Sequence, residues 1–119
     1  MSYDISFRVQ VHNTQSYINL NACDANTTWN LRNMIRESTG LEWINNQNNG
    51  FCDLIIPKIQ QGLEELSKHP EKYKQYEDPD GWGTVAQCIH FFNWIINDWN
   101  DYVQRTDADI VKQTTCWIT

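Results

Sequence analysis

The first eleven residues alternate between apolar and polar side chains, a pattern that predicts a β-strand with one buried face. The apolar members of this alternation are Tyr3, Ile5, Phe7, Val9 and Val11. A polar cluster at residues 12–15 predicts a turn, and residues 16–20 predict a returning strand, so we expect an antiparallel hairpin. The apolar face of such a hairpin requires a second layer of secondary structure to cover it.

Three later segments have the apolar spacing of helices and supply that layer. The first helix is expected from residue 29 up to Gly40, which suits the position just after a helix. The second is expected at residues 52–69, with apolar side chains on one face and charged ones on the other. The third is expected at residues 84–102, with Thr84 as its N-cap.

The C-terminal residues 110–118 alternate weakly and are rich in β-branched side chains, which predicts a third strand. The resulting order is β-β-α-α-α-β, an α+β fold with helices packed on one face of a small antiparallel sheet. A chain of 119 residues has room for one domain, residues 1–119, and for a core that needs no metal or disulfide. We also expect a homo-oligomer, because the C-terminal strand would leave an apolar sheet edge uncovered.

The cysteines stand at positions 23, 52, 88 and 116, and no two of them form a C-x-x-C pair. We therefore expect no metal, no cofactor and no disulfide, and interpret the four as small buried apolar residues. The N-terminus lacks the basic start and apolar run of a signal peptide, and no apolar stretch approaches the ~20 residues of a membrane helix. The sequence therefore predicts a cytoplasmic protein without a membrane partner.

The net charge of −6 argues against direct binding of nucleic acid, which requires clustered Lys and Arg, but permits contact with a basic protein. The sequence has no G-x-S-x-G, P-loop or H-E-x-x-H motif. His90 is interpreted as a packed or half-exposed histidine, and Asp98 and Asp101 as part of a solvated helix face. We therefore assign no catalytic residue.

The most informative feature is the placement of the tryptophans. Trp29 lies in the block NTTWN at residues 26–30, and Trp82 lies between two glycines just before Thr84. Both stand at expected helix starts, where exposed N–H groups and partial positive charge favour phosphate or carboxylate. An aromatic face beside such a start favours a stacked base.

These two helix starts predict a ligand pocket if the fold brings them together. Arg32 and Trp43 are added as wall residues because they closely follow the first start. The candidate ligand-binding residues are Asn26, Thr28, Trp29, Asn30, Arg32, Trp43, Trp82 and Thr84. The alternative is that both tryptophans fill the core while the Thr and Asn residues only cap helices.

Four segments give the chain a resemblance to a family of short phage and prophage proteins. They are the opening MSYDI, the block NTTWN, the segment from Gly62 to Tyr73, and DGWGT at residues 80–84. The resemblance covers roughly residues 1–105 and departs at Asp80, where the family tends to have Asn, and at Trp29, where Tyr is commoner. The family has no generally assigned activity.

What the resemblance implies is a protein that acts in the cytoplasm of an infected bacterial cell, where short phage proteins often counteract host antiviral defence. One hypothesis is a sponge that sequesters a small nucleotide-type immune signal. A second is an acidic inhibitor that binds a host defence protein such as a CRISPR nuclease. A third is a small enzyme that degrades the nucleotide. The concentration of Trp, Asn and Thr favours the sponge.

Overall fold

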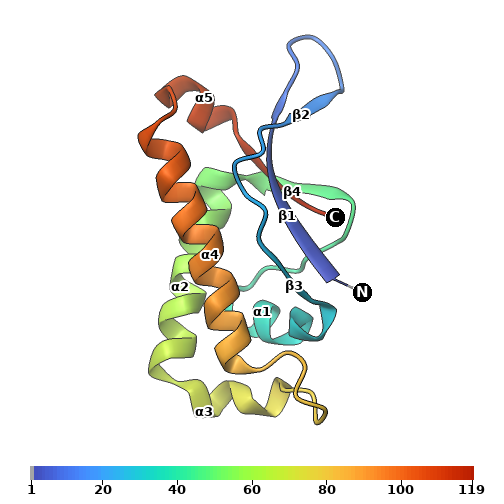
Figure 1. Cartoon of the computed structure of the whole chain (residues 1–119), viewed down its shortest axis with the longest axis vertical. Coiled ribbons are helices and arrows are strands. Elements are labelled where there is room, and N and C mark those ends of the chain that lie inside the picture. The colour runs from blue at the N-terminus through green and yellow to red at the C-terminus, as the bar shows by residue number, and fades with distance from the viewer. Residues whose placement is uncertain (1) are drawn as a thin grey trace.

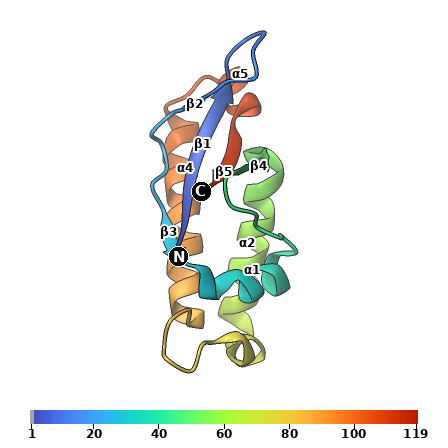
Figure 2. The same cartoon turned by 90° about the vertical axis from the view of Figure 1, so that its right-hand side faces the viewer.

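In the computed structural model, which describes residues 2–119, an antiparallel sheet lies against a layer of helices (Figure 1). The sheet follows the order β2-β1-β5-β4, and β3 pairs with the N-terminal half of β1. Figure 2 shows the strands in front of α2 and α4, which cover the other face of the sheet. The strands are β1 (Ser2–Gln10), β2 (Tyr17–Asn19), β3 (Asn26–Thr28), β4 (Gln47–Phe51) and β5 (Thr115–Ile118).

The helical layer consists of two long helices and several short ones. The long helices α2 and α4 pack against each other, and α1 packs against both. Among the described helices, none combines the length and apolar character needed to cross a membrane. The helices are η1 (Trp29–Leu31), α1 (Arg32–Thr39), α2 (Cys52–Lys68), α3 (Pro70–Tyr73), η2 (Lys74–Tyr76), α4 (Val85–Gln104) and α5 (Ala108–Gln113), where η marks a 3-10 helix.

The expected α+β class and the N-terminal hairpin are both confirmed. β1 pairs with β2 in the register that sets Val9 opposite Ile18. The inward side chains of Tyr3, Ile5 and Phe7 are fully buried under the helices. Val9 is only partly buried, because the hairpin extends past the end of the helical layer (Figure 1).

Two strands were missed in segments that the sequence predicts as loops or helix starts. β3 and β4 consist of polar residues and glycine, NTT and QNNGF, without the alternation of a half-buried strand. Both pair through their backbones, β3 with β1 and β4 with β5, and the second ladder has an irregularity between Asn48 and Phe51. Their strand conformation comes from distant partners and not from local pattern.

The C-terminal strand was predicted too long, and it was predicted at an edge of the sheet, where it does not lie. Residues Ala108–Gln113 form α5, because the Asp107 side chain accepts a hydrogen bond from the Asp109 N–H and caps the helix. The remaining strand β5 lies between β1 and β4, so it is an interior strand. The expectation that β5 leaves an apolar sheet edge uncovered is therefore wrong. The homo-oligomer remains a prediction, but this reason for it no longer applies.

The cysteines lie where the sequence places them, in the apolar core. Cys23, Cys52, Cys88 and Cys116 are all buried, with free thiols. Burial raises the pKa of the Cys23 and Cys88 thiols well above the ordinary range. In the folded protein these thiols are therefore poor nucleophiles.

Candidate functional site

Two segments that lie far apart in the sequence form one hollow near the N-terminal end of α4. One is β3 with the 3-10 helix that follows it, and the other is the turn that precedes α4 (Figure 1). The hollow has a volume of about 650 Å³, which falls in the range of small-molecule sites. We call it the tryptophan hollow, and its lining residues are Ser2, Asn26, Thr27, Thr28, Trp29, Asn30 and Trp82.

A close approach between backbones joins the two segments. Gly81 and Gly83 both have positive φ, 84° and 86°, which glycine adopts without strain. A Cβ added at Gly83 would lie 3.0 Å from the Cβ of Asn30 and 3.2 Å from its carbonyl carbon. The missing side chain of Gly83 therefore allows the turn to rest on η1, and Trp82 is brought to the same hollow as Trp29.

Trp29 forms a fixed wall of the hollow. Its side chain is 40% exposed, and its ring centroid lies 6.2 Å from that of buried Tyr3. The indole Nε1 donates a hydrogen bond to Asn45 Oδ1 at 3.3 Å. The helix start beside it is closed by its own cap, because the Thr28 hydroxyl accepts from the Asn30 N–H at 3.3 Å. These contacts fix the indole and leave one part of it open to solvent.

Trp82 is the more accessible of the two tryptophans, with 64% of its side chain exposed. A residue this exposed contributes little apolar burial to the fold. The hypothesis that both tryptophans fill the core is therefore wrong. The other half of this hypothesis is confirmed for the threonines, since Thr28 and Thr84 cap helices, but not for Asn26, which lies in β3, or Asn30, which lies inside η1.

Four N–H groups at the start of α4, those of Gly83, Thr84, Val85 and Gln87, are engaged within the protein. Thr84 Oγ1 accepts from the Gln87 N–H at 3.1 Å, and Gln87 Oε1 accepts from the N–H groups of Thr84 and Gly83. Glu77 Oε2 accepts from the Val85 N–H at 2.7 Å, so a carboxylate already occupies this helix start. The expectation that these four donors are open to a phosphate is therefore wrong.

Three of the eight candidate residues lie outside the tryptophan hollow. The Arg32 guanidinium forms an ion pair with Glu42, with Nη2 and Oε1 2.6 Å apart, at the surface. Trp43 is 3% exposed and packs edge-on against Tyr3 in the core. Thr84 serves as the N-cap of α4. The five residues Asn26, Thr28, Trp29, Asn30 and Trp82 are brought together.

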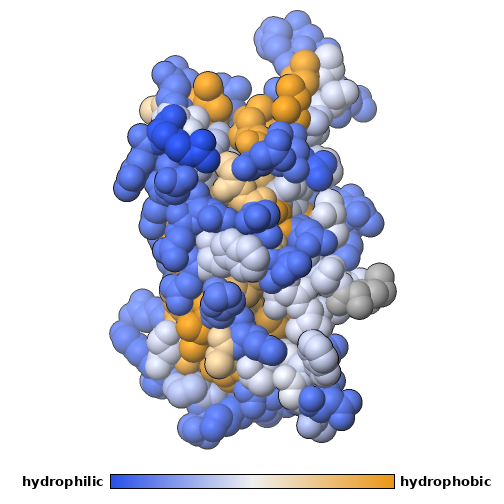
Figure 3. All heavy atoms as spheres, in the orientation of Figure 1, coloured by the Kyte–Doolittle hydropathy of each residue, from blue (hydrophilic) through white to orange (hydrophobic). Residues whose placement is uncertain are grey.

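A second hollow adjoins the first and was missed from the sequence. It has a volume of about 350 Å³ and shares residues 26–28 and Trp82 with the tryptophan hollow. We call it the α4 hollow, because its other lining residues, Ala86, Gln87, His90 and Phe91, all come from the first turns of α4. Figure 3 shows apolar atoms exposed over this lower part of α4. In the sequence, Ala86 and His90 are four residues apart and therefore share one face of the expected helix, which was the available indication of this hollow.

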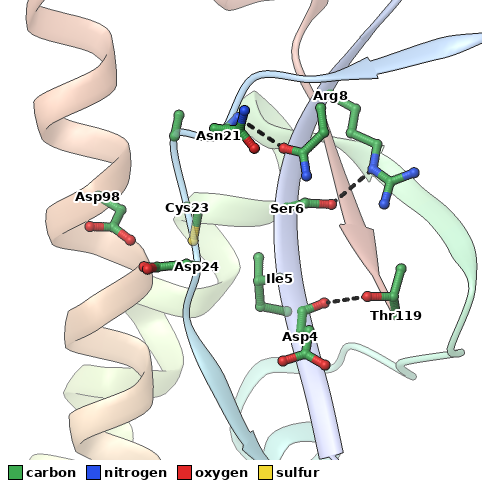
Figure 4. A pocket seen from close by; sticks show the side chains of 11 residues that line it. Asp4, Ile5, Ser6, Arg8, Asn21, Cys23, Asp24, Asp98 and Thr119 are labelled. Atoms are coloured by element: carbon green, nitrogen blue, oxygen red, sulfur yellow. Dashed lines mark hydrogen bonds between the residues drawn. The ribbon is translucent and has the colours of Figure 1, made fainter.

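A third hollow of about 590 Å³ lies where the chain after β2 runs past β1 (Figure 4). Its walls include Arg8, Asp24 and Asp98. The Arg8 guanidinium donates from Nε to Ser6 Oγ at 2.9 Å and stacks over the Trp117 ring at 4.7 Å. Asp98 Oδ2 is buried and has no hydrogen-bond partner among residues 2–119.

Burial raises the pKa of the Asp98 carboxyl, and the negative charge of Asp24 adds to the effect. Because the folded-state pKa lies above that of the unfolded chain, the ionised carboxylate destabilises the fold above that folded-state pKa. This penalty disappears as the pH falls below the unfolded value, about 4 for an aspartate. We expect Asp98→Asn to raise the melting temperature at about pH 7 and to have a smaller effect at about pH 3. Thermal melts of both proteins across this range test it, and an equal effect at both pH values would contradict it.

No protein-family model, curated protein or solved structure matches the chain.

Proposed function

We propose that this protein is a non-enzymatic binding protein that holds the base of a small nucleotide-type ligand in the tryptophan hollow. The observation that carries the proposal is the meeting of two exposed tryptophans from distant segments beside amide and hydroxyl side chains. A stacked base is typically worth ~1–3 kcal/mol on an aromatic side chain. The side chains of Asn26, Asn30 and Thr28 supply hydrogen-bonding groups for base edges or ribose hydroxyls.

The charge distribution indicates which part of the ligand is bound. The described lining of the tryptophan hollow contains no Lys or Arg, and Arg32 is held by Glu42. The carboxylate of Glu77 stands at the nearby start of α4, and the chain as a whole carries a net charge of −6. A phosphate would gain little in this surrounding, so the base and ribose enter the hollow while phosphate faces solvent.

The same lining favours binding over catalysis. Among the described residues that line the two adjoining hollows, His90 is the one histidine, and the lining holds no Asp, Glu, Cys or Lys beside it. A hydrolytic mechanism requires a positioned partner for such a group. The resemblance to phage proteins makes this proposal more specific: the protein acts as a sponge that sequesters a nucleotide-type immune signal of the host.

The alternative function is an acidic protein that inhibits a host defence effector. Its support is the net charge, together with acidic residues near the C-terminal end of α4. Two of these acids have structural partners, since Asp101 pairs with Arg105 at 3.1 Å and Asp107 caps α5. Because these two acids are engaged within the protein, whereas the tryptophan hollow is open, we favour the sponge over the inhibitor.

Native mass spectrometry of the protein purified from cells with active nucleotide signalling tests the proposal. We expect a retained small mass that absorbs as a nucleotide and leaves on denaturation. Calorimetric titration with the four ribonucleosides and their monophosphates is the second measurement. Because phosphate faces solvent, each nucleoside should bind about as well as its monophosphate. No retained mass together with no binding of any of these probes would contradict the proposed function.

A further inference from the structure

Trp82 stands at the boundary of two hollows and not at the end of one. It lines the tryptophan hollow together with Trp29, and it also lines the α4 hollow together with Phe91. Residues 26–28 form a continuous wall along both. Trp82 is 64% exposed, so much of the indole that lines the two hollows is accessible. An accessible aromatic ring shared by two hollows offers stacking surface to a planar group in each.

We infer that the ligand has two bases, which occupy the two adjoining hollows that share Trp82, so its class is a dinucleotide, linear or cyclic. This inference rests on the proposed function and narrows its ligand. The hollows have volumes of about 650 and 350 Å³, and each is in the range of small-molecule sites. A single base would fill one hollow and leave the other empty.

The polar groups of the α4 hollow suit a second base. Gln87 Oε1 accepts from the N–H groups of Thr84 and Gly83, which fixes the amide and turns its Nε2 into the available donor. His90 is exposed and its ring centroid lies 6.1 Å from that of Trp94. The imidazole supplies a further donor or acceptor at the open end of the hollow. Phe91 is buried and forms an apolar floor.

The absence of cations from the described lining limits the charge of the linker. A nucleoside triphosphate concentrates several negative charges on one ribose, beside the Glu77 carboxylate at the start of α4. A dinucleotide carries one or two phosphodiester charges between two bases, and these face solvent at the rim. The described lining of the two hollows thus matches a ligand with much stacking surface and little charge.

The test compares matched monomers and dimers. Calorimetry would measure the four ribonucleoside monophosphates, the corresponding linear homodinucleotides, and the cyclic di-adenylate and di-guanylate. We expect the best dinucleotide to bind at least roughly tenfold more tightly than its own monomer, because the second base adds a second stack. Equal affinity of every dimer and its monomer would overturn the two-base inference.

Ala86 offers a variant that affects one hollow alone. It is exposed in the first turn of α4 and lines the α4 hollow but not the tryptophan hollow. Leucine is a good helix former, so Ala86→Leu should keep the fold while filling the second hollow. We expect the ratio of dimer to monomer affinity to fall to about one in this variant.

The outcomes separate the two proposals. Monomer binding with no advantage for a dimer, in both wild type and Ala86→Leu, keeps the proposed function and overturns the two-base inference. No binding of any monomer or dimer by wild type overturns the proposed function itself. A melting curve of Ala86→Leu that matches wild type shows that the comparison is made between folded proteins.

Discussion

Replacing Trp82 by alanine is expected to weaken nucleotide binding by roughly 5- to 150-fold, the equivalent of a lost base stack of ~1–3 kcal/mol. The same change should leave the free energy of unfolding within about 0.5 kcal/mol of wild type, because 64% of the side chain is exposed. Binding is measured by calorimetry, which does not depend on the fluorescence of the remaining tryptophans. Stability is measured by urea unfolding.

A matched control is available in Trp43, which is 3% exposed and packs against Tyr3 and Phe91. Trp43→Ala creates a cavity and should lower the free energy of unfolding by ~3–5 kcal/mol. Trp82→Phe keeps a smaller ring and should retain part of the affinity. A Trp82→Ala protein that unfolds as easily as Trp43→Ala would show that Trp82 has a structural role, and unchanged affinity would remove it from the site.

The elements that could be predicted from the sequence are those whose pattern is local. The alternation from Tyr3 to Phe7 and the apolar stripes of α2 and α4 report burial on one face of one element. β4 has no such pattern, because it lies at the edge of the sheet and most of its side chains are polar. Its partner β5 follows more than sixty residues later. The pairing is a tertiary property that no local window contains.

Only part of the candidate site could be predicted, because local sequence patterns again do not contain tertiary contacts. Each tryptophan could be recognised by its neighbours, but their meeting depends on the contact between Gly83 and Asn30. Arg32 was included because it is close in sequence to Trp29, yet Glu42, ten residues further along, holds its guanidinium at the surface. The sequence predicted open N–H groups at the start of α4, because an acceptor such as Glu77 lies outside the helix and is not recognisable from the helix itself. Side-chain partners that are this far apart in the sequence are brought together only by the fold.

Gly83→Ala is expected to lower both stability and binding, because it acts on the contact that joins the two segments of the site. The backbone of Gly83 has φ 86°, where an alanine is strained by roughly 1–2 kcal/mol. Its Cβ would also lie 3.0 Å from the Cβ of Asn30 and 3.3 Å from the Asn30 carbonyl oxygen. The second contact involves backbone, so the turn must move away from η1, and it carries Trp82 away from Trp29.

Gly81→Ala is the matched control for this prediction. Its φ of 84° gives nearly the same backbone strain, but an added Cβ at Gly81 meets no atom within 4 Å. Gly81→Ala should therefore lose stability from strain alone, and Gly83→Ala should lose about 1–3 kcal/mol more from overpacking. Calorimetry should show affinity retained in Gly81→Ala and reduced at least severalfold in Gly83→Ala. If both variants bind the ligand equally well, the approach of Gly83 to Asn30 does not position Trp82, and a hollow shared by the two tryptophans loses its structural basis.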